Sequence, residues 1–368
     1  MTRQNQNRRP GVRSVESARL LLPHENTSLP MPRPSSILAA VAAAELREFL
    51  PEPFLDELRA LAPRFAHLDT LDLSVERFHR ALADADPEVV VACWSTPPLP
   101  ATLPSRLRYV AYLCGSIRQL VERRHIEDGL LVTNWGGSIS RIVAEGTLVH
   151  ILNCLRQSRH WMSLMHLEGG WKSDDRGAQP SPASLFGRRV GIHGFGYVAR
   201  ELVRLLRPFD CTISVFAPDV DPKVEADHGI TRAESLESLL SNNDVVVELA
   251  PLIPETSGII TERLLRLIPA GGVFVNTGRG AVVDPAALER VAREGRIAFG
   301  LDVFDVEPLP ADSPLRSLPN VCLTPHIAGQ TLDRFPDAGE FLVRNVRAYC
   351  EGGHLQALFT PERYDRIT

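Results

Sequence analysis

The stretch "VGIHGFGYVARELVRLL" at residues 190–206 decides the fold. A short apolar run leads into Gly194-x-Gly196-x-x-Ala199, and the apolar spacing of an amphipathic helix follows at once. In such a turn Gly194 permits a sharp reversal, Gly196 lets the backbone approach a pyrophosphate, and Ala199 keeps helix and strand close. The first N–H groups of the helix then face the negative charge. A tight strand-to-helix turn without any ligand would fit these letters equally well, so the surrounding sequence has to decide.

The surrounding sequence repeats the alternation of strand and helix. Six strand-like runs, most of them separated by helical segments, read "RRVGIHGFG", "CTISVFAP", "DVVVELAP", "GGVFVNTG", "IAFGLDVF" and "VCLTPHIAG". Such a series predicts a doubly wound α/β domain with a parallel sheet, which favours the nucleotide interpretation of the glycine loop.

The first part of the chain predicts a further α/β layer. "EVVVACWS" and "RYVAYLC" are typical of buried parallel strands, and "PFLDELRALA" and "SVERFHRALADA" of helices, the second with Ser74 as its N-cap. "SILAAVAAAE" fits a strand or a helix. Long helices are predicted over 144–165 and, at the end of the chain, over "DRFPDAGEFLVRNVRAYCEGG".

Composition indicates a globular enzyme without nucleic-acid or membrane partners. The chain has 368 residues, 44% of them hydrophobic and 23% charged, which is enough for two domains with separate cores. A net charge of -5 gives no reason to expect nucleic acid or an acidic membrane, and no apolar run is long enough to span a bilayer. The six cysteines form no CxxC pair, so we expect no metal site but reduced thiols in a cytoplasmic protein.

The first 35 residues are rich in Arg, Asn, Pro and Ser, and no apolar segment of a secretory signal follows them. We expect a disordered leader, or a start codon placed too early since Met31 is available, with a transit peptide as the alternative.

Three motifs at the ends of later strands carry the candidate chemistry. "VNTGRGAVVD" contains Arg279, "LDVFDVEPLP" contains Asp302 and Glu307, and "LTPHIAG" contains His326. Taken singly, they could be a surface arginine, a loop carboxylate and a structural histidine. Together, a guanidinium, a carboxylate and an imidazole at adjacent strand ends suit the reduction of a 2-oxo acid. The guanidinium binds the substrate carboxylate and polarises the carbonyl, the imidazolium donates a proton, and the carboxylate orients the imidazole.

From about residue 108 to 335 the chain resembles the D-isomer-specific 2-hydroxyacid dehydrogenase family. The resemblance rests on "VAEGTLVHILNCLRQ", "LFGRRVGIHGFGYVAR", "LAPLIPETSGIIT", "VNTGRGAVVD", "LDVFDVEPLP" and "LTPHIAG". Several long motifs in the right order make it highly specific.

The resemblance implies two Rossmann- or flavodoxin-like domains with an active site in the cleft between them. Residues 36–148 and 333–368 would form the substrate domain and residues 149–332 the domain that binds NAD. Arg279, Glu307 and His326 match the family's catalytic residues, and Gly115, Ser116 and Arg279 would bind substrate. The cofactor would contact Gly194, Gly196, Tyr197, Val198, Pro218, Asp219, Ala250, Pro251, Thr256, Thr277, Gly278, Asp302 and Gly329. Family habit further suggests a homodimer around the helix near 144–165.

Some positions depart from the family pattern, and they leave the substrate open. The substrate loop reads "CGSIRQLV", in which Arg118 is either a second substrate contact or a surface charge. Trp135 stands where a smaller residue is usual and hints at a bulky or shielded pocket, and Tyr197 replaces a basic or polar residue between the glycines.

The stretch "SVFAPDVDPK" at 214–223 bears on the choice between NAD and NADP. Counting from Gly194, the ribose-binding acid of the family falls on Ala217, and Asp219 either replaces it or touches only water. The first basic residue is Lys223, and two carboxylates precede it, so we expect NAD(H) with weakened discrimination against NADP(H).

The expected activity is reversible reduction of a 2-oxo acid to a D-2-hydroxy acid, of the glyoxylate/hydroxypyruvate reductase kind. Alternatives are an NAD(H)-sensing, corepressor-like binding protein and a 3-phosphoglycerate dehydrogenase without a regulatory domain, with phosphite oxidation more remote. Glu307 stands where formate dehydrogenases carry glutamine, which argues against that branch.

Overall fold

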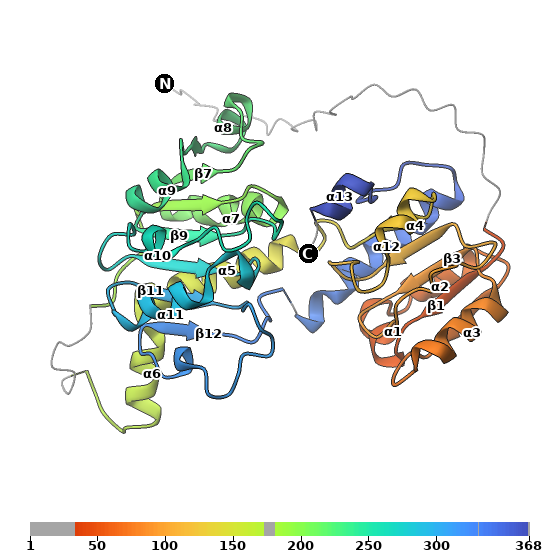
Figure 1. Cartoon of the computed structure of the whole chain (residues 1–368), viewed down its shortest axis with the longest axis horizontal. Helices are drawn as coiled ribbons and strands as arrows, with labels where there is room; N and C mark the ends of the chain where they lie inside the picture. Colours follow the sequence, from red (N-terminus) through yellow and green to blue (C-terminus); the bar gives the residue numbers. More distant parts are fainter. Residues whose placement is uncertain (1–33, 173–180, 330, 367–368) are drawn as a thin grey trace, which may run out of the picture.

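The computed structural model describes residues 34–172, 181–329 and 331–366. It contains two parallel sheets, each covered by helices, in two halves that lie side by side (Figure 1). The α/β class with parallel sheets, expected from the sequence, is confirmed. All but the last two residues of the expected leader, 1–35, lie outside the described part of the chain.

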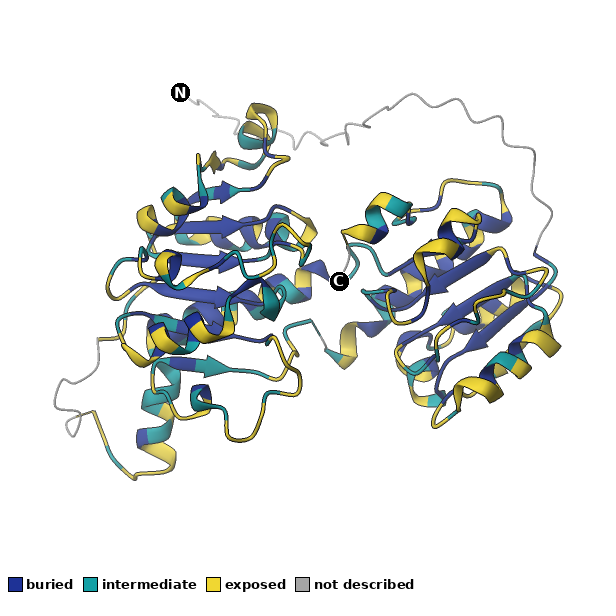
Figure 2. Ribbon diagram, viewed as in Figure 1, coloured by how far each residue is buried: buried dark blue, intermediate teal, exposed yellow. Residues whose placement is uncertain are grey.

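The first sheet has five parallel strands in the order β2-β1-β3-β4-β5. The strands are β1 (Ile37–Ala40), β2 (Phe65–Leu68), β3 (Val89–Ala92), β4 (Tyr109–Tyr112) and β5 (Leu131–Thr133). Every residue of the three central strands is buried, as expected for a parallel sheet with both faces covered (Figure 2). The ambiguous "SILAAVAAAE" contains both elements, since β1 is followed directly by helix α1 (Ala43–Phe49).

Helices from both ends of the chain cover this sheet. They are α1, α2 (Phe54–Ala60), α3 (Val75–Ala85), α4 (Arg123–Glu127), α12 (Phe335–Cys350) and α13 (Pro361–Asp365). Ser74 caps α3 as predicted, because its hydroxyl accepts from the Arg77 amide. The last long helix, α12, returns to the first half and packs against α1 and α2, so the end of the chain completes the N-terminal core.

The second sheet has seven parallel strands in the order β12-β11-β10-β9-β6-β7-β8. They are β6 (Arg189–His193), β7 (Thr212–Phe216), β8 (Thr231–Arg232), β9 (Val245–Glu248), β10 (Val273–Asn276), β11 (Ala298–Leu301) and β12 (Val321–Leu323). Six of these were predicted. The seventh, β8, has only two residues, both exposed, and therefore carries no apolar pattern.

The crossovers that connect β6 through β11 are helical. They are α7 (Tyr197–Leu206), α8 (Pro222–His228), α9 (Leu236–Asn242), α10 (Glu262–Leu265) and α11 (Pro285–Arg293). In the part of the chain that the structure describes, no helix has the length and apolar character needed to cross a membrane.

The helix predicted over 144–165 is two helices, α5 (Ser140–Arg156) and α6 (Ser158–His166). They are separated at Gln157, whose φ of 53° lies in the left-handed region and ends the first helix. Helix α5 packs against α7, β10 and β11. Its first turn contributes Ile142 to the core of the first half, and its later turns contribute Ile151 to the core of the second.

Candidate active site

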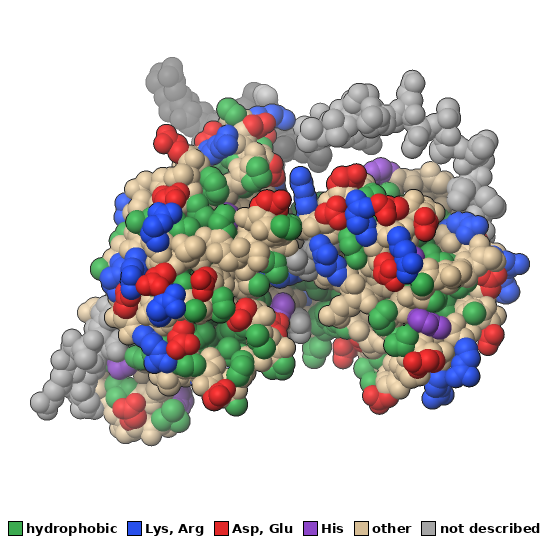
Figure 3. Space-filling view, in the orientation of Figure 1, with side chains coloured by type: hydrophobic (Ala, Val, Ile, Leu, Met, Phe, Trp, Pro, Cys, Tyr) green, Lys and Arg blue, Asp and Glu red, His purple; other side chains and the backbone are tan. Residues whose placement is uncertain are grey.

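The largest hollow described lies between the two halves and has a volume of about 750 Å³. Residues at the carboxyl ends of strands of both sheets line it, together with the start of α5 and of α7. The space-filling view shows the surface hollowed between the halves (Figure 3). Ligands bind at this edge of open parallel sheets, so the cavity is the candidate site.

The glycine loop joins β6 to α7 at one wall of this cavity. Gly194 has φ of 88°, and a Cβ there would lie 2.7 Å from the Ala250 nitrogen, so only glycine fits. At Gly196 a Cβ would meet no protein atom within 4 Å, which leaves the backbone open toward the cavity. Ala199 is fully buried against the sheet, as the motif requires.

Arg279 is held by a turn that follows β10. The buried Asn276 side chain accepts from the Gly278 amide and donates to the Arg279 carbonyl, both at 3.0 Å. A Cβ on Gly280 would overlap the Phe304 backbone, so the turn packs closely on the loop after β11. Burial lowers the pKa of Arg279 and the charge of Glu307 opposes this; an arginine stays charged in either case.

His326 and Glu307 form a hydrogen-bonded pair beside Arg279. The Nδ1 atom of His326 lies 2.7 Å from Glu307 Oε2, and the other carboxylate oxygen of Glu307 accepts from the Phe304 amide. His326 has φ of 56°, an uncommon conformation for a residue with a side chain, and its amide donates to the Asp302 carbonyl. Since Nδ1 is engaged by the carboxylate, Nε2 is the ring nitrogen left for a substrate.

Asp302 supports the loop that carries His326. Its buried carboxylate accepts from the Thr324 hydroxyl at 2.5 Å and from the amides of Ile327 and Ala328, both at 2.9 Å. We predicted Asp302 to be a cofactor contact; it lines the cavity, but these bonds occupy its oxygens. The Thr324 hydroxyl is also 2.8 Å from His150 Nε2 on α5. Sequence reasoning missed His150, although a histidine within an apolar helical stretch was a signal.

The structure brings most of the predicted residues to one cavity. Of the catalytic set, Arg279 and His326 line it, while Glu307 lines an adjoining hollow behind His326. The predicted substrate residues Gly115 and Ser116 line it as well. The predicted cofactor residues that line it are Gly196, Tyr197, Val198, Ala250, Pro251, Thr277, Gly278, Asp302 and Gly329.

The other predicted cofactor residues are Gly194, Pro218, Asp219 and Thr256, and they do not line this cavity. Gly194 shapes the loop through its positive φ and its close approach to Ala250. The Thr256 hydroxyl donates to the Pro251 carbonyl at 2.5 Å and so shapes the turn after β9. Pro218 and Asp219 lie exposed beyond the end of β7.

Beyond the end of β7, where the ribose of the cofactor is predicted to bind, one acidic side chain makes no hydrogen bond or ion pair with another described residue. Ala217 is buried, and Asp221 caps α8 by accepting from the Val224 amide at 2.8 Å. Asp219 is exposed and makes no hydrogen bond or ion pair within the described ranges.

A buried ion pair lies directly under the glycine loop. His193 Nδ1 is 2.7 Å from Glu248 Oε2, and Glu248 Oε1 accepts from the Ala250 amide at 2.8 Å. Burial lowers the pKa of His193, but the charge of Glu248 and its hydrogen bond outweigh burial and raise it. The pair thereby joins the ends of β6 and β9, from which the cofactor loops extend.

Arg118 of the substrate loop was expected to be either a second substrate contact or a surface charge, and its contacts bear on this choice. Its guanidinium donates to the carbonyls of Tyr364 and Asp365 and does not line the cavity, so Arg118 fastens the C-terminal segment. Trp135 does line the cavity. Residues of the first half that line it and that we did not predict include Trp94, Tyr112, Gln119 and Arg366.

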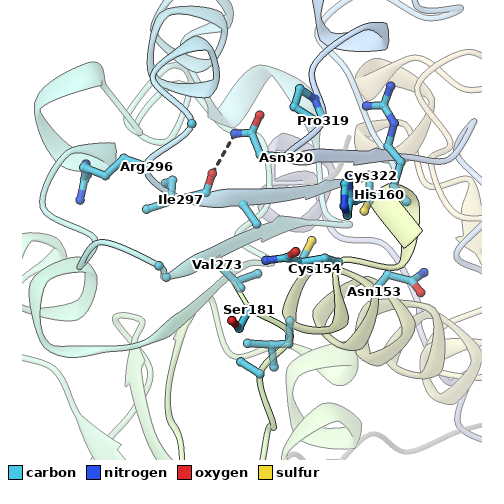
Figure 4. A pocket seen from close by; sticks show the side chains of 18 residues that line it. Asn153, Cys154, His160, Ser181, Val273, Arg296, Ile297, Pro319, Asn320 and Cys322 are labelled. Atoms are coloured by element: carbon cyan, nitrogen blue, oxygen red, sulfur yellow. Dashed lines mark hydrogen bonds between the residues drawn. The ribbon is translucent and has the colours of Figure 1, made fainter. Parts of the chain in front are cut away.

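A third and smaller hollow lies at the opposite edge of the seven-stranded sheet, where the strands begin (Figure 4). Its volume of about 60 Å³ holds a few water molecules and no dinucleotide. Asn320 crosses it and donates to the Ile297 carbonyl at 2.9 Å. This hollow is therefore too small for a cofactor, whereas the cavity between the two halves, at about 750 Å³, has room for a cofactor and substrate.

Known proteins resemble this chain along most of its length. A sequence profile described as D-isomer specific 2-hydroxyacid dehydrogenase, NAD binding domain, matches residues 148–328. A glyoxylate reductase from Aeropyrum pernix is 32% identical over 254 residues, which cover 67% of this chain and 74% of that protein. A mitochondrial formate dehydrogenase from Hordeum vulgare is 34% identical, over 56% of this chain and 54% of the enzyme. The crystal structure of an NADPH-dependent glyoxylate/hydroxypyruvate reductase from Sinorhizobium meliloti superposes with a TM-score of 0.70 at 26% identity, covering 90% and 98% of the two chains.

Proposed function

The chain belongs to the D-isomer-specific 2-hydroxyacid dehydrogenase family, as its motifs predicted, and from this we propose how its own residues perform the reaction. It is an oxidoreductase that acts on CH–OH groups with a nicotinamide cofactor. We propose reversible conversion of a 2-oxo acid to the D-2-hydroxy acid, catalysed by Arg279, Glu307 and His326. The observation that carries these roles is the position of Arg279 and the His326–Glu307 pair beside the glycine-loop cavity.

The residues of the second half fit a dinucleotide. A Cβ at Gly196 would enter open space, so the backbone at the start of α7 is free to approach a pyrophosphate. Thr277 is fixed by a 2.7 Å hydrogen bond between its hydroxyl and that of Thr147 on α5, which holds this part of the wall rigid. When bound, the cofactor supplies or accepts the hydride.

In the proposed mechanism the other parts come from this chain. Arg279 binds the substrate carboxylate and polarises the carbonyl, helped by the backbone amides of Gly115 and Ser116. His326 donates a proton from Nε2 to the carbonyl oxygen during reduction and takes it back during oxidation. Glu307 keeps the imidazole in place and balances its positive charge.

For the cofactor we propose NAD(H) rather than NADP(H), although discrimination is weakened by Ala217. Asp219 supports this proposal, because its exposed carboxylate can turn toward a ribose hydroxyl and would repel a 2′-phosphate. Lys223 is the first basic residue after the strand, and it lies beyond the second carboxylate, Asp221.

We further propose a cytoplasmic homodimer with 2-oxo acids of the glyoxylate and hydroxypyruvate kind among its substrates. All six cysteines are free thiols, which suits a reducing compartment. Exposed apolar side chains gather along α5, α6 and the segment after them, at Val149, Met162, Met165, Leu167 and Trp171. Such a patch favours association of two copies there. Analytical ultracentrifugation of the wild type and of Met162→Glu tests it, since a monomeric wild type contradicts the proposal.

The decisive experiment for the catalytic roles uses Arg279→Ala and His326→Ala. Steady-state rates are measured with glyoxylate, hydroxypyruvate, pyruvate and larger 2-oxo acids, after NADH binding has been verified by fluorescence titration. We expect kcat/KM to fall by about 10²–10³-fold or more in both variants. Wild-type rates in variants that bind NADH would refute the assignment. A wild type that binds NADH and reduces none of the acids would favour a dinucleotide sensor instead.

A further inference from the structure

Aromatic side chains form one wall of the cavity on the side of the first half. Trp94 follows β3, Tyr112 ends β4 and Trp135 follows β5. All three line the cavity that Arg279 and His326 also line. Three neighbouring strands of the first sheet thus each contribute one large ring at the same edge, and we call Trp94, Tyr112 and Trp135 the aromatic wall.

Trp94 is the least covered member of the aromatic wall. Its indole meets three rings edge-on, with centroids 5.4 Å from Phe49, 5.7 Å from Phe335 and 6.2 Å from Trp135. Phe49 and Phe335 are themselves buried, so they form a fixed base for the indole. Yet 45% of Trp94 remains exposed. A large apolar surface that is held rigidly and left uncovered in a cleft favours an apolar occupant.

The aromatic wall is in contact with the loop proposed to hold the substrate carboxylate. A Cβ on Gly115 would lie 3.0 Å from the Trp135 ring, so the absence of a side chain at Gly115 gives the indole its place. A substrate whose carboxylate is bound by Gly115, Ser116 and Arg279 therefore has the remainder of its carbon chain beside these rings. The part of a 2-oxo acid that varies between substrates is this remainder, the substituent on C2.

The size and polarity of the substituent on C2 decide how much apolar surface of the aromatic wall is buried when the substrate binds. A hydrogen, as in glyoxylate, leaves the Trp94 surface in water, and a hydroxymethyl group adds a polar atom next to it. A phenyl ring buries both surfaces and can meet an indole edge-on or offset. Gln119 and Arg366 also line the cavity, which leaves polar positions for a ring substituent.

From these contacts we propose that the preferred substrates of this enzyme are 2-oxo acids with an aromatic ring in the C2 substituent, recognised by Trp94. The proposal rests on the proposed function and specifies its substrate class. In the reduction, the hydride of NADH forms the new C–H bond at C2. The C=O π pair moves to oxygen, which takes the proton of His326, and the products are the D-2-hydroxy acid and NAD⁺.

The test compares phenylpyruvate and benzoylformate with glyoxylate and hydroxypyruvate, at saturating NADH and with the full chain. We expect the larger kcat/KM for the aromatic acids, by about tenfold or more, as the value of a buried aromatic contact implies. Trp94→Ala should lower kcat/KM for phenylpyruvate by about tenfold and reduce the preference over glyoxylate, mainly through KM. Trp94→Phe, which keeps an aromatic ring, should retain most of the preference.

Phe186→Ala is the matched control, since Phe186 is an aromatic residue that is 63% exposed and lies outside the cavity. It should change neither rate. NADH titration and thermal unfolding show whether the Trp94 variants are folded, and Trp94→Phe keeps the test valid if the alanine variant is not. The substrate assignment is overturned, while the proposed reaction stands, if the wild type prefers glyoxylate. It is overturned in the same way if Trp94→Phe loses no activity and Trp94→Ala loses equal activity on phenylpyruvate and glyoxylate. A wild type that binds NADH and reduces none of the four acids overturns both.

Discussion

The imidazole Nε2 of His150 lies 2.8 Å from the hydroxyl of Thr324, and that hydroxyl donates onward to the Asp302 carboxylate. Burial lowers the pKa of His150, although the charge of Asp302 opposes this, so the ring is neutral at pH 7. Since Thr324 gives its proton to Asp302, it accepts one from His150. This chain of bonds ends at the amides of Ile327 and Ala328, next to His326.

His150 is therefore expected to position the catalytic loop without touching the substrate. His150→Leu should lower kcat about tenfold, because small displacements of a reacting group are costly, with little change in the Kd of NADH. His150→Gln should recover most of the rate, since its amide can donate to Thr324 from a similar position. Steady-state kinetics and NADH titration of both variants test this. Equal losses in the two variants would show that the side chain acts only by filling space.

Substitution by alanine should affect different properties at the two glycines of the loop between β6 and α7: stability at Gly194 and NADH binding at Gly196. Gly194→Ala places a methyl group 2.7 Å from the Ala250 nitrogen at a positive φ, which should cost about 1–3 kcal/mol of unfolding free energy. Gly196→Ala meets no protein atom and should leave stability within about 0.5 kcal/mol of wild type. It should nevertheless raise the Kd of NADH about tenfold, or about 1.4 kcal/mol. Urea unfolding and NADH titration separate the two effects, and an unaltered Kd in Gly196→Ala would contradict the proposed cofactor position.

The buried pair His193–Glu248 should make stability depend on pH. Burial opposes the raised pKa of His193, but Glu248 prevails, so the pair stabilises the fold below the ordinary pKa of about 6.5. That contribution is lost as the pH rises through the raised pKa of the folded state. His193→Asn should cost about 3 kcal/mol or more at pH 6 and less at pH 9. Urea unfolding at both pH values measures this, with His354→Asn, on an exposed residue, as the control. A cost that does not vary with pH would rule out a charged His193.

Asp219 and Asp221 offer a matched pair of carboxylates for testing cofactor preference. Asp219→Ser should shift the ratio of kcat/KM for NADH and NADPH toward NADPH by about threefold to tenfold, because a repelling charge near the 2′-phosphate is removed. Asp221→Ser removes the same charge but retains an N-cap for α8, so its ratio should change little. Initial rates with each cofactor at fixed 2-oxo acid provide the comparison. A larger shift in Asp221→Ser would place the ribose elsewhere.

The sequence predicted which residues of the second half lie at the cavity better than it predicted the shape of the cavity. The glycine loop, Arg279, Glu307 and His326 could be found because strand ends and charged side chains in glycine-rich turns leave a local pattern. The aromatic wall was found only in part, at Trp135. Trp94 and Tyr112 come from another sheet, and only the packing of the two halves brings them to the cavity that Arg279 also lines.

The features that escaped prediction leave no local pattern in the sequence, for different physical reasons. Strand β2 has four residues, none fully buried and none β-branched, and β8 has only two, both exposed, so neither shows a recognisable strand pattern. The interruption at Gln157 depends on one left-handed residue within an otherwise continuous helical pattern. The engagement of Asp302 by the loop at 324–328 depends on contacts across 22 to 26 residues, which no local pattern reveals.

Helix α5 starts in the core of one half and continues into the core of the other, so it links the two halves (Figure 1). A Cβ on Gly146 would lie 2.7 Å from the Ala328 carbonyl oxygen, so the loop that carries His326 packs directly against α5. If the halves swing apart to admit substrate, the pivot falls at the first turn of α5, before Gly146. The imidazole then travels with the glycine loop, and the swing separates it from Gly115 and Trp94. Opening would thus admit substrate without disturbing the alignment between His326, the proposed proton donor, and the proposed cofactor site.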